Sequence, residues 1–312
     1  MQQSVIVAAR SAVAQDVYSF ELVGADSALL PFTAGAHIDV FLPSGRVRQY
    51  SLCNDPADSA RYVIGVLKEA NGRGGSEEMH GIPEGARLSV GVPRNCFPLA
   101  DRAAPAVLFA GGIGVTPLLA MAHDLARDQV PFHMYFAARG RARAAFHDQI
   151  RSSDFADRVS FLFDDQGQRL DAAAVMRESP AGTHFYACGP KGFIAMIEAA
   201  AGSCGRAEFF HSELFSQAAP SAGDAPFDLV LAKAGITVTV APDETALSAL
   251  RRAGITIPTM CEQGVCGTCL TKVVDGLPDH RDLCLSSEER SANDCFVPCC
   301  SRALSLALVV DL

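Results

Sequence analysis

A cysteine-rich segment near the end of the chain constrains the fold more than any other feature. Cys261, Cys266 and Cys269 follow the pattern C-x4-C-x2-C, and either Cys299 or Cys300 can supply a fourth thiolate. Three cysteines at this spacing with a fourth further along are typical of plant-type [2Fe–2S] ligands. The segment therefore predicts an iron–sulfur centre and a small domain built to carry it.

Two other interpretations explain this spacing less well. A structural zinc site usually has two C-x2-C pairs, whereas this segment has one such pair and an x4 spacing. Scattered structural cysteines would not have Gly264 and Gly267 between them, where glycines allow a loop to bring backbone amides toward sulfur. The cysteines outside this pattern are expected to be small, buried, apolar residues: Cys53, Cys96, Cys204, Cys284 and Cys295.

The composition limits the class of protein. A chain of 312 residues is longer than one hydrophobic core usually accommodates, so its length predicts two or three domains. The net charge of −9, without a basic block, disfavours nucleic-acid binding. The N-terminus does not resemble a secretory signal, and no run approaches the ~18 apolar residues of a membrane span. Eleven cysteines, an odd number, do not suit a disulfide framework. We expect a cytoplasmic, monomeric protein without membrane or nucleic-acid partners.

Patterning divides the chain into three domains. Residues 1–102 have short alternating runs broken by glycines, which predicts an antiparallel β-barrel. Residues 103–216 begin with a strand, a helix and a second strand, which predicts an α/β domain with a parallel sheet. Residues 217–226 read as a linker, and residues 227–312 form the cysteine-bearing unit. The clearest predicted elements are strands 18–23, 36–42, 61–68, 87–90, 106–110, 132–138, 184–187, 228–233, 237–240 and 305–311, and helices 118–127 and 246–253.

Two segments of the first domain could hold a phosphorylated ring. Arg48, Tyr50 and Ser51 form an R-x-Y-S element, in which the guanidinium suits a phosphate and the tyrosine suits an aromatic ring. The turn 72–76 is rich in glycine and contains Ser76, so its free amides could surround a phosphate. Taken alone, an exposed strand face and a flexible loop explain these two segments as well.

Two further segments lie after predicted strands of the second domain. Residues 111–117 open a helix, where backbone amides can face a pyrophosphate. The segment is not a true G-x-G-x-x-G, because Pro117 stands at the third glycine position. Cys188, Gly189 and Pro190 follow another strand, and a lone C-G-P can equally be a simple turn.

With these motifs, the whole chain resembles the phthalate dioxygenase reductase family, and its nearest subgroup is the vanillate demethylase reductases. The resemblance rests on CEQGVCGTC, PDHRD and PCCSRA in the last domain, on R-x-Y-S and R-G-G-S in the first, and on G-G-x-G-x-T-P and C-G-P in the second. It implies a flavin barrel, a nicotinamide-binding α/β domain and a C-terminal β-grasp ferredoxin domain. It also implies that Cys299, before Cys300-Ser301-Arg302, is the fourth ligand.

The resemblance implies FMN, rather than FAD, and NADH as the other cofactor. The implied FMN contacts are Arg48, Tyr50, Ser51, Gly74, Gly75, Ser76 and Phe215, the last from the H-x-E-x-F motif at 211–215. The implied nicotinamide contacts are Gly112, Gly114, Thr116, Arg139, Cys188, Gly189 and Pro190. Ser51, Cys188, Glu213 and Phe215 form the implied catalytic set. Without the resemblance, Phe215 would be read as a core residue, and Arg139 and Arg141 would hint at a 2′-phosphate.

These cofactors predict a linear electron path. A hydride carries two electrons while an iron–sulfur cluster accepts one, so a flavin must stand between NADH and the cluster. We expect the reductase component of a two-component Rieske-type aromatic oxygenase or O-demethylase. The alternatives are a reductase serving a cytochrome P450 or another one-electron acceptor, a simple electron carrier, and a self-sufficient oxygenase. The partner would dock weakly at the cysteine loop, where Glu262 is a candidate contact.

Overall fold

The structure is a computed structural model that describes residues 2–69, 74–215, 223–259, 261–262, 264, 266–282 and 284–312. The chain divides into two compact units, Met1–Phe215 and Ser216–Leu312. The first unit contains both the expected barrel and the expected parallel sheet, and a domain boundary at residue 102 stays a prediction. None of the described helices is long and apolar enough to cross a membrane.

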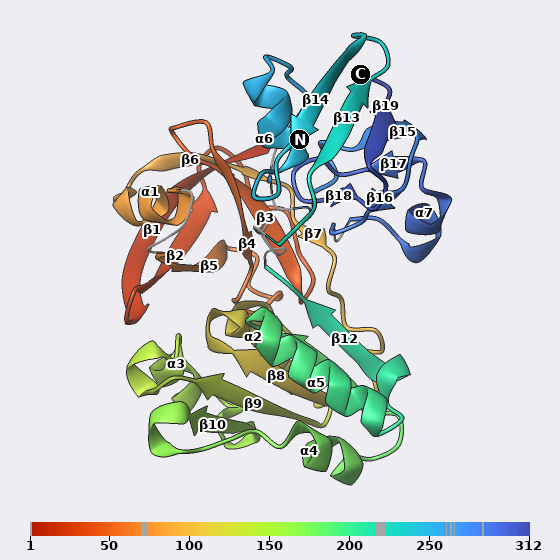
Figure 1. Cartoon of the computed structure of the whole chain (residues 1–312). Helices are drawn as coiled ribbons and strands as arrows, with labels where there is room; N and C mark the ends of the chain where they lie inside the picture. The colour runs from red at the N-terminus through yellow and green to blue at the C-terminus, as the bar shows by residue number, and fades with distance from the viewer. Residues whose placement is uncertain are drawn as a thin grey trace. The chain divides into compact units, whose positions relative to one another are not determined.

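Antiparallel strands form a barrel in the first part of the chain (Figure 1). Their order is β4-β3-β6-β1-β2-β5, and the short β7 pairs with β3. A bridge between Leu52, just after β4, and Ile64 of β5 joins the two edge strands and closes the barrel. The bounds are β1 Gln2–Ala14, β2 Val17–Gly24, β3 Ala36–Phe41, β4 Val47–Ser51, β5 Arg61–Leu67, β6 Arg87–Gly91, β7 Arg94–Asn95 and helix α1 Gly75–Gly81.

The barrel interior follows from the alternation along its strands. Phe20 and Leu22 of β2 are fully buried, as are Tyr62, Ile64 and Val66 of β5, while the residues between them are more exposed or lie against other elements. Successive side chains of a strand point to opposite faces, so such a pattern turns one face toward a core. The barrel core and the packing under helix α2 form one continuous cluster.

Five parallel strands with helices on both faces make up the second half of this unit (Figure 1). The strand order is β10-β9-β8-β11-β12. Leu108 and Ala110 of β8 face the core shared with α2, while Val107 and Phe109 face the cluster that includes residues of α4 and α5. The bounds are β8 Ala106–Gly111, β9 Phe132–Ala138, β10 Val159–Phe163, β11 His184–Cys188, β12 Phe210–Glu213, α2 Val115–Arg127, α3 His147–Arg151, α4 Ala172–Glu178 and α5 Lys191–Ser203.

The second unit is a mixed sheet with its own core, as the predicted ferredoxin fold requires (Figure 1). The strand order is β14-β13-β19-β15-β17, with β13 and β19 parallel. Leu247 and Leu250 of α6 belong to the same buried cluster as Leu229 and Leu308 of the sheet. The bounds are β13 Phe227–Leu231, β14 Ile236–Val240, β15 Thr271–Asp275, β16 Pro278–Asp279, β17 Cys295–Phe296, β18 Arg302–Ala303, β19 Ala307–Val310, α6 Ala246–Arg252 and α7 Ser287–Ala292.

Candidate electron-transfer site

The parallel sheet changes direction between β8 and β11, which are adjacent in space but not in sequence. Loops that leave such a point diverge, and ligands of open α/β sheets bind in the crevice between them. Here the two loops also touch at their bases. A Cβ on Gly114 would lie 2.3 Å from the Cys188 carbonyl oxygen, and a Cβ on Gly189 would lie 2.9 Å from the Gly111 Cα. Only glycine permits this approach.

The predicted nicotinamide residues fall into three groups around this point. Gly112 has a φ of 55° with open space where a side chain would be, and it lies beside Gly114 at the start of α2. Thr116 is buried; its hydroxyl donates to the Ile113 carbonyl oxygen at 3.0 Å. Arg139 is exposed at the end of β9, the strand next to β8. The structure thus brings the glycine loop and the Cys188–Pro190 turn together, with Arg139 further along the same edge.

Three of the predicted catalytic residues meet where the barrel and the parallel sheet join. Cys188 and Glu213 are register partners on β11 and β12, and the Ser51 hydroxyl, at the end of β4, donates a hydrogen bond to the Glu213 carboxyl group. Burial raises the pKa of Glu213 to about 8. Burial, and secondarily the Glu213 charge, raises the pKa of the Cys188 thiol well above its usual value. At neutral pH the Cys188 thiol therefore stays protonated, and Glu213 favours its protonated form.

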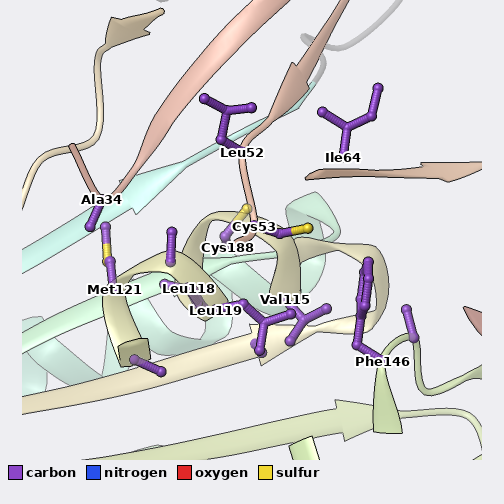
Figure 2. Close-up of a cluster of buried hydrophobic side chains, with 14 of the residues drawn as sticks. Ala34, Leu52, Cys53, Ile64, Val115, Leu118, Leu119, Met121, Phe146 and Cys188 are labelled. Atoms are coloured by element: carbon purple, nitrogen blue, oxygen red, sulfur yellow. The ribbon is translucent and has the colours of Figure 1, made fainter. Parts of the chain in front are cut away.

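The fourth predicted catalytic residue, Phe215, is half-buried and packs against the core that the barrel shares with α2. Figure 2 shows part of that core, where Leu52 and Cys53 of the barrel lie near Cys188 and Leu118. This packing fixes β4, which carries Ser51, against the strand that carries Cys188.

The predicted flavin residues on β4 and α1 are also brought together. A Cβ on Gly75 would lie 2.1 Å from Arg48 Nε, so the guanidinium lies directly against the start of α1. Gly74 has a φ of 79°, which favours glycine. The Ser76 hydroxyl accepts a hydrogen bond from the Glu69 amide at 3.1 Å. Gly72 of the predicted turn 72–76, and Arg73 of its R-G-G-S segment, lie outside the described residues.

The hydroxyl of Tyr50 supports a bound group at this place. It is buried and lacks a hydrogen-bond partner among the described residues, and burial raises its pKa. A buried phenol normally has a partner. The polar edge of a flavin ring bound over β4 would give the Tyr50 hydroxyl a hydrogen-bond partner. The residues present therefore fit a flavin.

The four predicted cluster ligands form two pairs. The thiols of Cys261 and Cys266 share a hydrogen bond, which lowers the pKa of Cys266. The Cys266 amide lies 3.4 Å from Cys261 Sγ. Cys269 and Cys299 are in side-chain hydrogen-bond contact. Within the described residues no three ligand side chains surround one point, as they would around a single zinc ion. Two pairs of thiols fit a cluster in which each of two irons takes two cysteines.

The loop that carries these cysteines has a tightly turned backbone. Gly264 and Gly267 have φ values of 74° and 68°, and Glu262 has a φ of 54°. Glu262 Oε1 lies 2.5 Å from Arg251 Nη2 of α6, which also donates to the Thr259 hydroxyl at 3.2 Å. Glu262, the candidate docking contact, is therefore engaged in an ion pair within its own unit.

The remaining cysteines only partly match the expectation of burial. Cys53 is buried, whereas Cys204, Cys284 and Cys295 are half-buried. Cys96 is exposed, so its predicted burial is wrong: it lies between Asn95 and Phe97, and Phe97 turns inward in its place. Cys300 is buried, with its thiol 3.7 Å from the Val297 carbonyl oxygen.

Known proteins resemble the chain along its whole length. Residues 230–304 match the 2Fe-2S iron-sulfur cluster binding domain family. The chain is 47% identical to the vanillate O-demethylase oxidoreductase of Pseudomonas sp. (strain HR199 / DSM 7063), with 99% of each chain covered. It is 36% identical to the phthalate dioxygenase reductase of Burkholderia cepacia, over 98% of this chain and 96% of that protein. The chain belongs to this reductase family.

Solved structures agree with this assignment. A phthalate dioxygenase reductase described as modular for electron transfer from pyridine nucleotides to [2Fe–2S] superposes with a TM-score of 0.78 at 35% identity, covering 100% of this chain and 98% of that one. An intact self-sufficient cytochrome P450 monooxygenase superposes with a TM-score of 0.79 at 36% identity, where this chain matches 41% of the larger one. The reductase carries electrons from NADH through a flavin to a [2Fe–2S] cluster, as a component of an aromatic oxygenase or demethylase system.

Proposed function

We propose that the reductase delivers its electrons to a separate Rieske-type oxygenase or O-demethylase. The observation that carries this proposal is the full-length identity of 47% to a vanillate O-demethylase oxidoreductase. A haem protein is the second candidate acceptor. Two observations favour it. Part of a self-sufficient cytochrome P450 has the same fold as this chain, and the chain is 38% identical to the beta subunit of a heme-dependent oxidative N-demethylase.

We further propose that the flavin is FMN. Arg48 against Gly75 is suited to a terminal phosphate. Beyond this point the Arg46 guanidinium lies 3.9 Å from the ideal Cβ position on Gly74 and pairs with Glu78 at 3.2 Å. Glu78 also accepts from the Ser44 hydroxyl at 2.5 Å. A dinucleotide flavin whose adenylate extended past Gly74 would have to displace this ion pair, whereas FMN has no adenylate to place there.

The residues near the predicted ribose position fit NADH as the donor, because carboxylates offset the arginines there. Arg141 pairs with Asp148 at 3.2 Å, and the space over Gly140 is closed by Asp165, whose carboxylate would lie 2.3 Å from a Cβ there. Asp164, beside Asp165, pairs with Arg169 at 2.8 Å. A ribose hydroxyl could donate to the Asp165 carboxylate, whereas a 2′-phosphate at the same place would meet a like charge.

The chain's own residues keep the proposed reaction site largely uncharged at neutral pH. When bound, a flavin accepts two electrons as a hydride and releases them one at a time. Glu213, neutral at pH 7, can hold a proton on its carboxyl group beside the Ser51 hydroxyl. Cys188 supplies a small, uncharged side chain at the strand end. Phe215 would cover the ring, and the glycines of both loops leave room for the nicotinamide.

At the other end of the path, Cys261 and Cys266 would hold one iron, and Cys269 and Cys299 the other. Backbone amides would offset the negative charge of such a cluster. The Gly264 amide already faces Cys299 Sγ, and the Cys266 amide faces Cys261 Sγ. The positive φ of Gly264 orients its amide in this way.

Three measurements test these proposals. An anaerobic spectrum before and after NADH should show bleaching of both flavin and cluster, and chromatography of the extracted flavin should give FMN. Reconstitution should support turnover by a Rieske O-demethylase and not by a cytochrome P450 supplied at equal concentration. Extraction of FAD, or turnover with the P450 alone, would overturn the corresponding assignment.

Removing residues 227–312 tests the order of the path. Because Met1–Phe215 has its own cores, the shortened chain should still bind flavin and reduce small dyes with NADH. It should no longer deliver electrons to the oxygenase. Oxygenase turnover by the shortened chain would contradict a path that leaves through the iron–sulfur unit.

A further inference from the structure

A charged cluster at the far end of α2 links three parts of the first unit. We call it the α2 clamp and define it as Asp55, Arg102, Asp124 and Arg127. Asp55 lies in the loop after β4, Arg102 lies between the barrel and β8, and Asp124 and Arg127 lie in the last turn of α2. No residue of this cluster belongs to the predicted flavin, nicotinamide or iron–sulfur sites.

The clamp is built on a buried carboxylate. The side chain of Asp124 is only 2% exposed, and it pairs with Arg127 and, at 2.7 Å, with Arg102. A buried carboxylate needs such partners because removing it from water is costly. Asp124 therefore fixes the direction of both guanidinium groups, which are otherwise half-exposed on long side chains.

Arg127 carries this constraint across to the barrel. Its Nη1 donates to Asp55 Oδ1 at 2.5 Å, while its Nη2 donates to Asp124. The Asp55 loop is itself held by Asn54, whose side chain accepts from the Val63 amide at 2.9 Å and donates to the Arg61 carbonyl oxygen at 3.0 Å. The Asp55 loop is thus hydrogen-bonded to β5 through Asn54. Ser51, the last residue of β4, precedes Asp55 by four residues in the chain.

Helix α2 connects these contacts to the proposed site of hydride transfer. It spans Val115–Arg127, about 20 Å at 1.5 Å per residue. Its first residues follow the glycine loop at Gly112 and Gly114, and Thr116 packs beneath Gly65 of β5. The helix therefore contacts the barrel at both ends, and Figure 2 shows the apolar packing between them, with Val115 and Leu118 below Leu52 and Ile64.

We propose that Asp55, Asp124 and Arg127 are positioning residues, which hold the nicotinamide loop at a fixed distance from the flavin strand. The inference rests on the proposed placement of FMN over β4 and of the nicotinamide at the start of α2. Without the Asp55 contact, the end of α2 could move relative to the barrel, and its first turn would move with it. Misplacement by about 1 Å can cost up to about a hundredfold in rate.

Asp55→Asn is the test variant because Asp55 is 34% exposed and its loss leaves no buried charge unpaired. In stopped-flow reduction of the FMN-loaded protein, the limiting rate should fall about tenfold, with the apparent Kd for NADH changed less than about twofold. The long-wavelength charge-transfer absorbance of the nicotinamide–flavin complex should weaken, and flavin content and Tm should be unchanged. Asp55→Glu should restore most of the rate.

Asp128→Asn is the matched control. Asp128 contacts the same two arginines, Arg102 at 2.8 Å and Arg127 at 3.6 Å, but it follows α2 directly and does not reach the barrel. The limiting rate of flavin reduction in Asp128→Asn should equal that of the wild type. A wild-type rate in Asp55→Asn, or an equal loss in Asp128→Asn, would overturn the proposal. Failure of the wild type to bind FMN or to be reduced by NADH would instead overturn the proposed function.

Discussion

The Ser51 hydroxyl of barrel strand β4 donates a hydrogen bond to the carboxyl group of Glu213, on strand β12 of the parallel sheet. The second carboxyl oxygen of Glu213 is buried without a hydrogen-bond partner among the described residues. This contact connects the two halves of the first unit through a single titratable group, so its protonation state affects both stability and the proposed reaction site.

Glu213 should make stability depend on pH. Its pKa is about 8 in the folded protein against 4.5 for an ordinary glutamate, so the folded state favours the protonated form. Its stabilising contribution is complete below pH 4.5 and is lost as the pH rises through 8. Between pH 5 and 9 the Tm of the wild type should therefore fall by about 5–10 °C more than that of Glu213→Gln, which stays neutral. Parallel curves would contradict this, and the exposed Glu198→Gln should follow the wild type.

The space over Gly75 should control flavin binding. In Gly75→Ala the new methyl group would displace the Arg48 guanidinium, since its Cβ would lie 2.1 Å from Arg48 Nε. Loss of one charge-assisted hydrogen bond to the phosphate should weaken FMN binding about tenfold or more, measured by fluorescence titration of the deflavinated protein. Gly81→Ala, at the other end of α1, has nothing within 4 Å and is the control. Equal FMN affinities of the two variants would contradict the predicted contact between Arg48 and the phosphate.

Of the two adjacent cysteines, Cys299 should be the ligand. Its thiol contacts Cys269, whereas Cys300 Sγ lies 3.8 Å from the Ser301 hydroxyl and would be 2.5 Å from a Cβ on Gly264. Cys300→Ser should retain two irons per chain with an unchanged electron paramagnetic resonance signal, and Cys299→Ser should lose the cluster. If iron and sulfide analysis showed that Cys300→Ser loses the cluster and Cys299→Ser retains it, Cys300 would be the ligand instead.

Arg251 should protect the cluster by holding its loop. The left-handed backbone at Glu262 costs about 1–2 kcal/mol for a residue with a Cβ, and the ion pair with Arg251 helps to keep it in place. Arg251→Ala should shorten the half-life of the cluster against an iron chelator by about two- to fivefold, followed by visible absorbance. Arg252→Ala is the control, because Arg252 pairs with Glu244 and not with the loop. Equal half-lives would assign the Glu262–Arg251 pair no role in cluster retention.

Local sequence patterns predicted about half of the helices and strands that the structure describes. Residues 132–138 were predicted as a strand and form β9 with the same bounds. The 13-residue strand β1 was not predicted, because its bulges break the alternation along it. The turn predicted at 72–76 enters helix α1 at Gly75. Helix α7 was also missed, although the capping box formed by Ser286 and Glu289 was a readable signal.

The sequence alone determined the iron–sulfur spacing, the order of the domains and the two strand-end loops. These features depend on residues a few positions apart, where spacing fixes geometry. Only the tertiary structure decided that Ser51 contacts Glu213, that Glu262 pairs with Arg251, and that Asp55 pairs with Arg127. Those contacts join residues on different elements, and their positions depend on how each sheet packs. Burial has the same origin: the raised pKa of Glu213 and the exposure of Cys96 both follow from the packed core around each residue rather than from its neighbours in the chain.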